Sequence, residues 1–398
     1  MLRLMFVTGS LVHGGAERHS ITLMNRLAER GHECHGVYVK DDPAQRDRIE
    51  LRGQGSLRCL DARRYLDRRA LADFAAHLAR VRPQVIVAAN AYALLYASLA
   101  RWQAGLDAPL LVTYHSTKLL GAKEQLKMLL ERFFFLAADC LVFVCENQQR
   151  YWRRRLVFAR RNEVIHNGID TGRFAAADWN GPAQVVRRRY GFAATDYVIG
   201  MVAVLRPEKN HLQLLEAVAR LRQQGIPANA LLVGDGPMRE AIEVRARQLG
   251  IGAFVAVTGF QEDVRPYIAA CDVVALCSVT EAFSLAAIEA MAMGRPVIHS
   301  DVGGAAEMIE PGRNGFLFPV GDTETLVYAL TLLSDRPSAL RMGSHAREVV
   351  ERRFSETTML DRYEQTLLSL CQPPSTHRSV PPRKSLLVGN QDRSSVEE

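Results

Sequence analysis

Two glutamates, Glu281 and Glu289, are the residues of this chain whose types and spacing best suit chemistry. They lie in the segment Glu281–Ile298, E-A-F-S-L-A-A-I-E-A-M-A-M-G-R-P-V-I. If a helix begins near Ser284, Glu281 lies in the preceding loop and Glu289 in the second turn, with free backbone N–H groups between them. At about 1.5 Å per helical residue the carboxylates lie roughly 10 Å apart, too far to share a proton. The spacing suits the two ends of a long charged ligand, such as a nucleotide sugar.

Two cations, Arg206 and Lys209, follow the predicted strand Val198–Val204 and precede a predicted helix. Positive side chains at a helix N-terminus oppose the helix dipole, which costs roughly a few tenths of a kcal/mol each. A bound diphosphate removes this conflict, because Arg206 can contact it as a planar fork and Lys209 as a point charge. Two solvated surface cations are the alternative, and the glutamate pair favours the phosphate site over it.

Gly15 and His115 each follow a predicted strand, at the edge of a parallel sheet where ligands bind. Gly15, in G-G-A-E, would let a backbone N–H group approach a phosphate. Its loop reads G-S-L-V-H-G-G, so the G-x-G-x-x-G fingerprint of nicotinamide cofactors is absent. His115 can hydrogen-bond a sugar hydroxyl. A tight turn at Gly15 and a structural role for His115 are the alternatives.

Two glycine loops follow strands of the second half and are expected to line the slot for a nucleotide base. They contribute Gly234 and Gly236, in G-D-G-P, and Phe260, which follows a glycine. The G-D-G-P loop is also good turn chemistry that needs no ligand, because Pro suits the first turn of a helix. Asn167-Gly168 is expected to form a turn at a hinge between the halves.

The N-terminal half carries most of the positive charge. Residues 1–180 contain 27 Lys and Arg against 18 Asp and Glu, whereas the remainder contains 23 against 25. Two basic stretches in this half, 118–135 and 150–161, interleave cations with apolar residues. The members expected at an acceptor or a membrane are Lys118, Lys123, Lys127, Trp152 and Arg153. Contact with anionic lipid, with Trp152 at the interface, is favoured over two solvated helix faces, and no nucleic-acid-binding motif is present.

Short apolar strands alternate with amphipathic helices along the chain, which predicts an α/β protein with two open parallel sheets. The predicted strands are Leu2–Val7, Cys34–Val39, Gln84–Ala88, Leu110–Tyr114, Cys140–Val144, Val198–Val204, Ala230–Val233, Phe254–Val257, Val273–Leu276 and Pro296–His299. Helices predicted by their period include Ala16–Arg30, Leu71–Arg80, Leu126–Ala137, Leu212–Gln223 and Met238–Gly250. A polar connection after Asp170 is taken as the linker between the halves.

The bulk composition is that of a globular protein. The chain has 398 residues, of which 48% are hydrophobic and 23% charged, so two domains are expected. The predicted parts are an acceptor domain 1–172, a nucleotide-sugar domain 173–354, a helix 355–371 that returns to the first domain, and a disordered tail 372–398. Scattered cysteines, and the lack of a signal pattern or a long apolar run, favour a cytoplasmic protein. The basic half favours a peripheral position at the inner face of the cytoplasmic membrane.

These motifs in this order resemble family 4 of the retaining glycosyltransferases, enzymes of the GT-B fold. The resemblance extends in layout over roughly residues 2–371, and its specific part is the E-x7-E signature from Glu281 to Glu289. The Arg206 and Lys209 pair, G-D-G-P, N-G-I-D and G-G-A-E accompany it. The chain departs from the family pattern at Ala282, where Gly is common, and at Ala306, where Pro is frequent.

The family implies two Rossmann-like, doubly wound parallel-sheet domains that face a central cleft, with the donor mainly in the C-terminal one. The roles it implies are ribose binding by Glu289, donor-sugar binding by Glu281, diphosphate binding by Arg206 and Lys209, backbone contacts to phosphate at Gly15, Phe283, Ser284 and Leu285, and a position beside the sugar for His115.

The expected chemistry is sugar transfer with retention of configuration, with Glu281, His115, Arg206 and Lys209 as the catalytic residues. The cations and a helix N-terminus would stabilise the departing diphosphate. No D-x-D motif occurs, so these cations would replace a metal clamp, and neither a metal nor a cofactor is expected. Front-face attack, with the leaving phosphate taking the acceptor proton, is favoured over Glu281 as a covalent nucleophile.

The leading hypothesis is a transferase that moves a sugar from a UDP or GDP sugar to a lipid-linked or polysaccharide acceptor, in exopolysaccharide or lipopolysaccharide synthesis. A nucleotide-sugar epimerase of the same fold would instead form product without an acceptor. A non-catalytic glycan- or nucleotide-binding protein would bind the donor without transfer or hydrolysis. A phosphorylase would need a pyridoxal lysine, and Lys209 lies where phosphate is expected.

Overall fold

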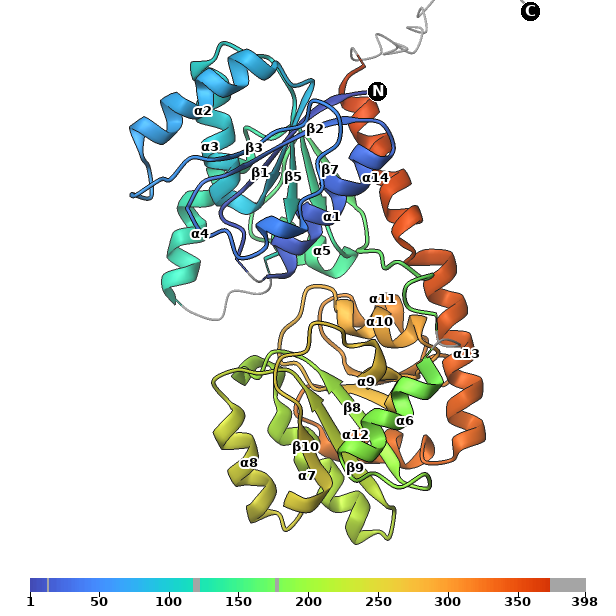
Figure 1. The fold of residues 1–398 in the computed structure, drawn as a ribbon. Coiled ribbons are helices and arrows are strands. Elements are labelled where there is room, and N and C mark those ends of the chain that lie inside the picture. The colour runs from blue at the N-terminus through green and yellow to red at the C-terminus, as the bar shows by residue number, and fades with distance from the viewer. Residues whose placement is uncertain (13, 117–121, 176–178, 373–398) are drawn as a thin grey trace, which may run out of the picture.

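The computed structural model describes residues 1–12, 14–116, 122–175 and 179–372, and in the helix that starts at Ala122 it leaves out the side chains of 122–127 and 130. Two parallel sheets lie one above the other (Figure 1). The N-terminal sheet has the strands β1 (Arg3–Thr8), β2 (Glu33–Tyr38), β3 (Leu57–Cys59), β4 (Val85–Ala89), β5 (Leu110–Tyr114), β6 (Cys140–Phe143) and β7 (Arg161–Val164). The C-terminal sheet has β8 (Tyr197–Val202), β9 (Ala228–Val233), β10 (Val255–Val257), β11 (Val273–Leu276), β12 (Val297–Ser300) and β13 (Gly315–Phe318).

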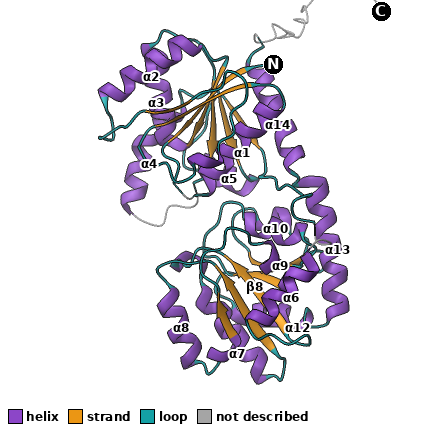
Figure 2. Cartoon of the chain, in the orientation of Figure 1, coloured by secondary structure: helices purple, strands orange, loops and turns teal. Residues whose placement is uncertain are grey.

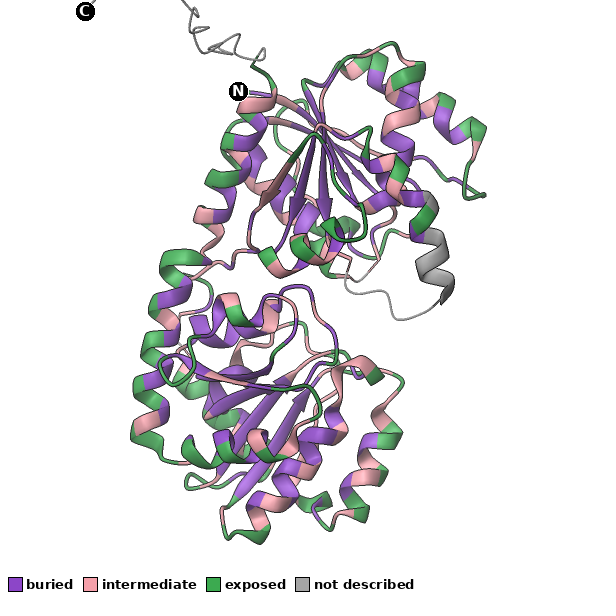
Figure 3. Cartoon of the chain, turned by 180° about the vertical axis from the view of Figure 1, so that it is seen from behind, coloured by how far each residue is buried: buried purple, intermediate pink, exposed green. Residues whose placement is uncertain are grey.

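Helices cover both faces of each sheet, and the strands are almost wholly buried (Figures 2 and 3). The N-terminal half contains α1 (Gly15–Glu29), α2 (Arg68–Val81), α3 (Asn90–Gln103), α4 (Ala122–Phe135) and α5 (Glu146–Arg153). The C-terminal half contains α6 (Asn180–Arg189), α7 (His211–Gln223), α8 (Arg239–Gln248), α9 (Arg265–Ala270), α10 (Leu285–Ala292), α11 (Ala305–Met308), α12 (Thr323–Leu332), α13 (Arg336–Arg353) and α14 (Glu356–Leu370). Alternate residues of β1 enter different cores: Met5 and Val7 pack on one face of the sheet, Leu4 and Phe6 on the other.

The strand order places two pairs of loops where ligands bind in such folds. The orders are β3-β2-β1-β4-β5-β6-β7 and β10-β9-β8-β11-β12-β13, so the order reverses between β1 and β4 and again between β8 and β11. Loops at such a point diverge and leave room beyond the carboxyl ends of the strands. In the C-terminal sheet the loop after β8 carries Arg206 and Lys209, and the loop after β11 carries Glu281. The sequence-predicted site residues therefore converge by topology.

Four elements were not expected from the sequence. β3, β7 and β13 are short strands at sheet edges, and β7 reads R-N-E-V, a polar pattern that an edge strand tolerates. The connection assigned to a linker contains α6, because Asn180-Gly181-Pro182 forms the first helical turn, where Pro is tolerated. Edge strands and the helix in the polar connection are partly exposed on one side, so their sequences predict them less clearly than those of the central elements.

Two crossovers join the halves and run side by side. The N–H group of Ile169 donates to Phe354 O (2.9 Å), and the N–H group of Glu356 donates to Ile169 O (2.8 Å). Gly168 allows this approach, because a Cβ atom there would lie 2.5 Å from Ser355 O. Helix α14 then packs on the N-terminal half (Figure 1), and its Tyr363 is buried in the same hydrophobic core as Leu4. The tail expected to be disordered is 372–398, and its residues 373–398 lie outside the described part of the chain.

Candidate active site

The loop between β11 and α10 holds Glu281 against Lys209. Ser284 caps α10 by accepting a hydrogen bond from the N–H group of Ala287 (3.3 Å), so the predicted start of this helix is confirmed. Glu281 forms an ion pair with Lys209, and Ser278 Oγ lies 3.5 Å from the same carboxylate oxygen. The structure thus brings together a carboxylate and a cation that are separated by 72 residues.

The loop after β8 treats its two cations differently. Pro207–Lys209 forms a 3₁₀ turn, and Asn210 adopts a left-handed conformation before α7 begins at His211. This turn directs Lys209 to Glu281, whereas the Arg206 side chain is 59% exposed and its nearest carboxylate, that of Glu208, is 3.9 Å away. Arg206 is therefore free to reorient toward an anion, while Lys209 is already held.

Glu289 contacts the other half of the molecule. Its carboxylate is buried in the second turn of α10 and receives Arg18 Nη2 of α1 at 3.4 Å. Arg18 follows the G-G-A-E motif directly, so the N-terminus of α1 and that of α10 face each other across the junction between the sheets. The two glutamates thus have different cationic partners, Lys209 and Arg18, and their tasks stay predictions.

Two glycines support the backbone of the Glu281 loop. Gly303 has a φ of +57°, and a Cβ atom there would lie 2.2 Å from Glu281 O and 2.5 Å from Ala282 O. The N–H group of Gly304 donates to Ala282 O (2.8 Å). Ala282 is not among the described residues with positive φ, so the departure from the family's glycine is tolerated. Phe283 packs against Phe354 with ring centroids 5.5 Å apart.

His115 directly follows β5, and its half-buried ring lies beside the buried ring of His19. Its backbone N–H group donates to Asn90 Oδ1 (2.9 Å), and its ring centroid lies 4.7 Å from that of His19, which is hydrogen-bonded to Tyr363 Oη (3.1 Å). Burial, and to a lesser extent the neighbouring His19, lower the pKa of His115 well below its ordinary value. His115 is therefore neutral near pH 7, which suits a hydrogen bond to a hydroxyl but not a charge.

The glycine loops have structural reasons of their own. A Cβ atom at Gly234 would lie 2.0 Å from Ala203 O, and one at Gly236 would lie 2.6 Å from Leu205 O. The chain therefore needs both glycines whatever binds there. At Gly15 a Cβ atom would meet nothing within 4 Å, and Phe260 is 68% exposed. Contacts of these four residues with a donor stay predictions.

Comparison with known proteins decides the family. The model described as Glycosyl transferases group 1 matches residues 183–349, and the model described as Glycosyltransferase Family 4 matches residues 13–173. The chain is a family 4 glycosyltransferase. The lipopolysaccharide core biosynthesis glycosyltransferase LpsE of Rhizobium meliloti (strain 1021) is 29% identical to it over 361 residues, which cover 89% of this chain and 96% of that protein.

Two further proteins are similar to this glycosyltransferase. N-acetyl-alpha-D-glucosaminyl L-malate synthase of Bacillus anthracis is 29% identical over 271 residues, which cover 67% of this chain and 70% of that protein. The crystal structure of Anabaena HepE in complex with UDP matches with a TM-score of 0.80 at 24% identity, over 92% of this chain and 100% of that chain. The GT-B fold expected from the sequence is confirmed by this likeness.

The expectation for Trp152 is wrong. Its side chain is fully buried, stacks edge-on against Tyr114 and donates from Nε1 to Ser116 O (3.2 Å), so it cannot lie at a lipid interface. Arg153, the next residue of α5, is exposed. Lys118 lies outside the described residues. Lys123 and Lys127 belong to α4, but their side chains are not described. No helix in the described part of the chain is long and apolar enough to cross a membrane.

Sequence reasoning missed three residues of the junction. Arg18 and His19 lie at the start of α1, and the cation directly after G-G-A-E is the signal that could have indicated Arg18. Glu307 of α11 accepts hydrogen bonds from the N–H groups of Glu146 and Asn147 (both 3.0 Å) and contacts His166 Nε2 (2.8 Å). It joins the C-terminal half to the start of α5. In the described residues no group of three or more His, Cys, Asp or Glu could hold a metal ion.

The raised pKa of Glu289 predicts how this residue affects the stability of the protein at different pH values. Burial raises it above 4.5, and Arg18 and Arg173 oppose the rise only in part. Between the unfolded and the folded pKa the native state binds more protons, so this group's contribution to stability falls as pH rises. Glu289→Gln should therefore raise the melting temperature at pH 7, and by less near pH 4.5, in scanning calorimetry. Exposed Glu324→Gln is the control; a lower melting temperature for Glu289→Gln at pH 7 would contradict this account.

Proposed function

We propose that this protein transfers a sugar, with retention of configuration, from a nucleotide-diphosphate sugar to a glycan acceptor. One observation carries the proposal: Lys209 pairs with Glu281 on the two loops that flank the reversal of strand order in the C-terminal sheet. The cation and the carboxylate lie side by side beyond the ends of the strands. There Lys209 can bind a diphosphate, and Glu281 can accept a hydrogen bond from a sugar hydroxyl. Glu289 of α10 and Arg18 of α1 supply a second polar pair, which joins the two halves.

In the proposed donor complex the diphosphate takes Lys209 from Glu281 and draws in the exposed Arg206. The freed Glu281 carboxylate accepts hydrogen bonds from hydroxyls of the transferred sugar. Glu289 accepts from the ribose hydroxyls, and the backbone N–H groups of Phe283–Leu285 and Gly15 add to the phosphate site, because N–H groups at the start of a helix have no partner within it. Gly234, Gly236 and Phe260 line the base.

The proposed chemical step breaks the bond between the anomeric carbon and the β-phosphate oxygen and forms one from the same carbon to the acceptor oxygen. The acceptor proton passes to the departing phosphate, on the face that the diphosphate leaves. Arg206, Lys209 and the N-terminus of α10 stabilise the negative charge that develops on the diphosphate. Neutral His115 hydrogen-bonds a sugar hydroxyl. Because side chains carry this charge, transfer is expected to persist in a chelator such as EDTA.

The substrate classes rest on the relatives. The similarity to LpsE supports an acceptor that belongs to a cell-surface glycan, lipopolysaccharide or exopolysaccharide, and the UDP complex of HepE supports a UDP sugar ahead of a GDP sugar. We further propose that residues 1–172 bind the acceptor, that 173–354 bind the donor, and that 355–371 tie the two together. Two separate hydrophobic cores support this division, since Tyr197 and Phe318 belong to one, and Met5 and Phe143 to another.

Contact with an anionic membrane is proposed at α4 in place of Trp152. Phe133 and Leu136 at the end of this helix are 58% and 56% exposed, and the Arg132 guanidinium lies 5.1 Å from the Phe133 ring centroid. Apolar side chains beside a cation suit a headgroup boundary. Phe133→Ser with Leu136→Ser should weaken binding to phosphatidylglycerol vesicles by about 10-fold, measured by sedimentation. Tyr328→Ser, an exposed residue of α12, should not; equal loss in both variants would contradict the assignment.

The experiment that tests the function is a transfer assay with UDP- and GDP-sugars and a lipid-linked glycan acceptor, read by mass spectrometry and by proton NMR of the new linkage. Product that needs the acceptor and keeps the donor's anomeric configuration is expected. An epimer formed from donor alone would indicate the epimerase, and tight donor binding without transfer or hydrolysis would indicate a binding protein. Inverted configuration would contradict the front-face mechanism.

A further inference from the structure

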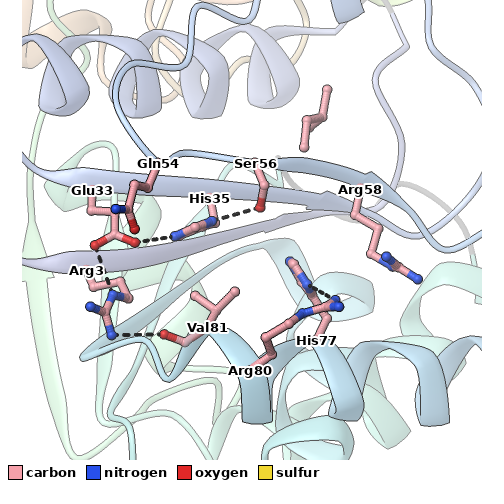
Figure 4. Close-up of a pocket in the computed structure, with 10 residues that line it drawn as sticks. Arg3, Glu33, His35, Gln54, Ser56, Arg58, His77, Arg80 and Val81 are labelled. Carbon is pink, nitrogen blue, oxygen red and sulfur yellow. Dashed lines mark hydrogen bonds and ion pairs between the residues drawn. The ribbon is translucent and has the colours of Figure 1, made fainter.

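Two cavities lie away from the candidate active site, and they differ in how far carboxylates of the protein balance the arginines that line them. The first, of about 460 Å³, opens at the amino end of the N-terminal sheet. Its polar groups already engage one another: Arg3 pairs with Glu33, Glu33 contacts His35, and Arg80 Nη2 lies 3.1 Å from His77 Nδ1 (Figure 4). Arg58 pairs with Asp73, so among the residues described Arg80 is the one guanidinium of this lining with no carboxylate within 4.0 Å.

The second cavity, of about 580 Å³, opens at the amino end of the C-terminal sheet, where β11 and β12 begin. That edge is opposite to the one that carries Glu281 and Lys209. Its charged lining is four arginines and one carboxylate: Arg187, Arg188, Arg295, Arg336 and Asp272. Its apolar lining includes Phe192, Pro296 and Leu340. A cavity of this size suits a small molecule, and its charge suits an anion.

The one carboxylate of this lining is already engaged. Asp272 Oδ2 accepts from Arg187 Nη2 and from the N–H group of Val198, both at 2.8 Å. Its other oxygen lies 3.9 Å from Arg336 Nε. Within the described part of the chain, neither Arg188 nor Arg295 has a carboxylate partner within 4.0 Å. Two guanidinium groups therefore face the cavity without a counter-charge from the protein.

Arg295 makes this imbalance costly, because it is largely buried. Its Nη2 donates to Ala269 O (2.9 Å), but its buried Nε has no acceptor among the residues described. Burial lowers the pKa of Arg295; Cys271 and Asp272 oppose this shift in part, and the positive charge of Arg187 adds a smaller lowering effect. A buried cation without an anionic partner destabilises the fold, and an anion in the cavity would offset that cost.

We propose that this cavity is a second ligand site, which binds an organic phosphate between Arg188 and Arg295 with its apolar part over Phe192 and Leu340. Guanidinium groups bind phosphate oxygens bidentately, and a phosphate dianion balances two of them. A carboxylate would balance only one. The site is separate from the proposed donor site, since it lies at the other edge of the same sheet.

The test uses the full chain carrying Arg206→Ala and Lys209→Ala, so that the proposed donor site does not contribute, and titrates phenyl phosphate and inorganic phosphate by calorimetry. One site is expected, with the phenyl ester bound more tightly. Arg188→Gln should weaken binding at least about 10-fold, since a hydrogen bond to a charged group is lost. Arg295→Gln should weaken it at least as much. Arg80→Gln, in the other cavity, is the control and should change nothing.

Every result of this titration either supports the phosphate site or overturns it. No binding, or equal affinity in Arg188→Gln, overturns the site, and equal affinity for the two probes overturns the organic ligand. Arg188 is exposed, so its variant is expected to fold even where Arg295→Gln does not. Sugar transfer is measured separately, on the protein with Arg206 and Lys209 intact. A failed phosphate titration therefore leaves the proposed function standing, and a failed transfer assay leaves the phosphate site standing.

Discussion

Replacing both Arg206 and Lys209 by Ala is expected to reduce kcat of sugar transfer by at least about 1,000-fold. Loss of one group that stabilises developing charge costs about 100- to 1,000-fold in enzymes of other classes. Here both side chains are assigned to the leaving diphosphate, and Lys209 is already held beside Glu281. Initial rates with saturating donor and acceptor, with product measured by mass spectrometry, give the comparison directly.

The matched control is Arg220→Ala. Arg220 is a partly exposed cation of α7 that pairs with Glu324, so its loss changes the net charge without touching the junction. This variant should transfer sugar at the wild-type rate. Circular dichroism and thermal melts of the double variant separate lost catalysis from lost folding. Transfer within about 10-fold of wild type by a folded double variant would contradict the donor-site assignment.

Gly303→Ala is expected to destabilise the protein by about 3 kcal/mol and to abolish donor binding at the temperature of the assay. A left-handed conformation costs a residue with a Cβ atom roughly 1–2 kcal/mol, and overpacking typically adds about 1–3 kcal/mol. The new Cβ atom would lie 2.2 Å from Glu281 O, so either the Gly303 turn or the Glu281 loop must move. Denaturant unfolding and donor titration measure the two effects.

Gly312→Ala separates the two causes. Gly312 also has a positive φ, +80°, but a Cβ atom there would meet nothing within 4 Å. Its substitution should cost about 1 kcal/mol and leave donor binding intact. If Gly303→Ala were no more harmful than Gly312→Ala, the close packing of the two loops would not position Glu281.

The central strands and the helix start at Ser284 could be predicted because local signals and burial agree there. The bounds of β5 and β11, Leu110–Tyr114 and Val273–Leu276, match the predicted strands, since both are runs buried on two faces in which Thr113 is the one hydrophilic residue. The edge strands could not be predicted in this way. β7 exposes polar side chains and is held by pairing with β6, a contact that its own sequence does not encode.

The candidate site is likewise divided into contacts that could be predicted from the sequence and contacts that could not. The proximity of Lys209 and Glu281 follows from the position of both loops at the carboxyl ends of parallel strands, and parallel strands could be predicted from the alternation of strands and helices. The partnership of Arg18 with Glu289 joins residues 271 positions apart and depends on how the two sheets face each other. The burial of Trp152 depends likewise on the cover that Tyr114 and its neighbours provide. An amphipathic pattern does not tell which face of a helix another element will cover.

The most direct test of the donor site is a thermal-shift panel of UDP-, GDP-, ADP- and dTDP-sugars on the wild-type protein and on the double variant of Arg206 and Lys209. A selective donor at about 100 times its Kd stabilises by roughly 2.7 kcal/mol, which corresponds to a rise in melting temperature of about 5 °C. We expect such a rise with one kind of nucleotide sugar in the wild type, a UDP sugar ahead of the others, and none in the double variant. No rise with any of the four, or an equal rise in both proteins, would contradict the donor-site assignment.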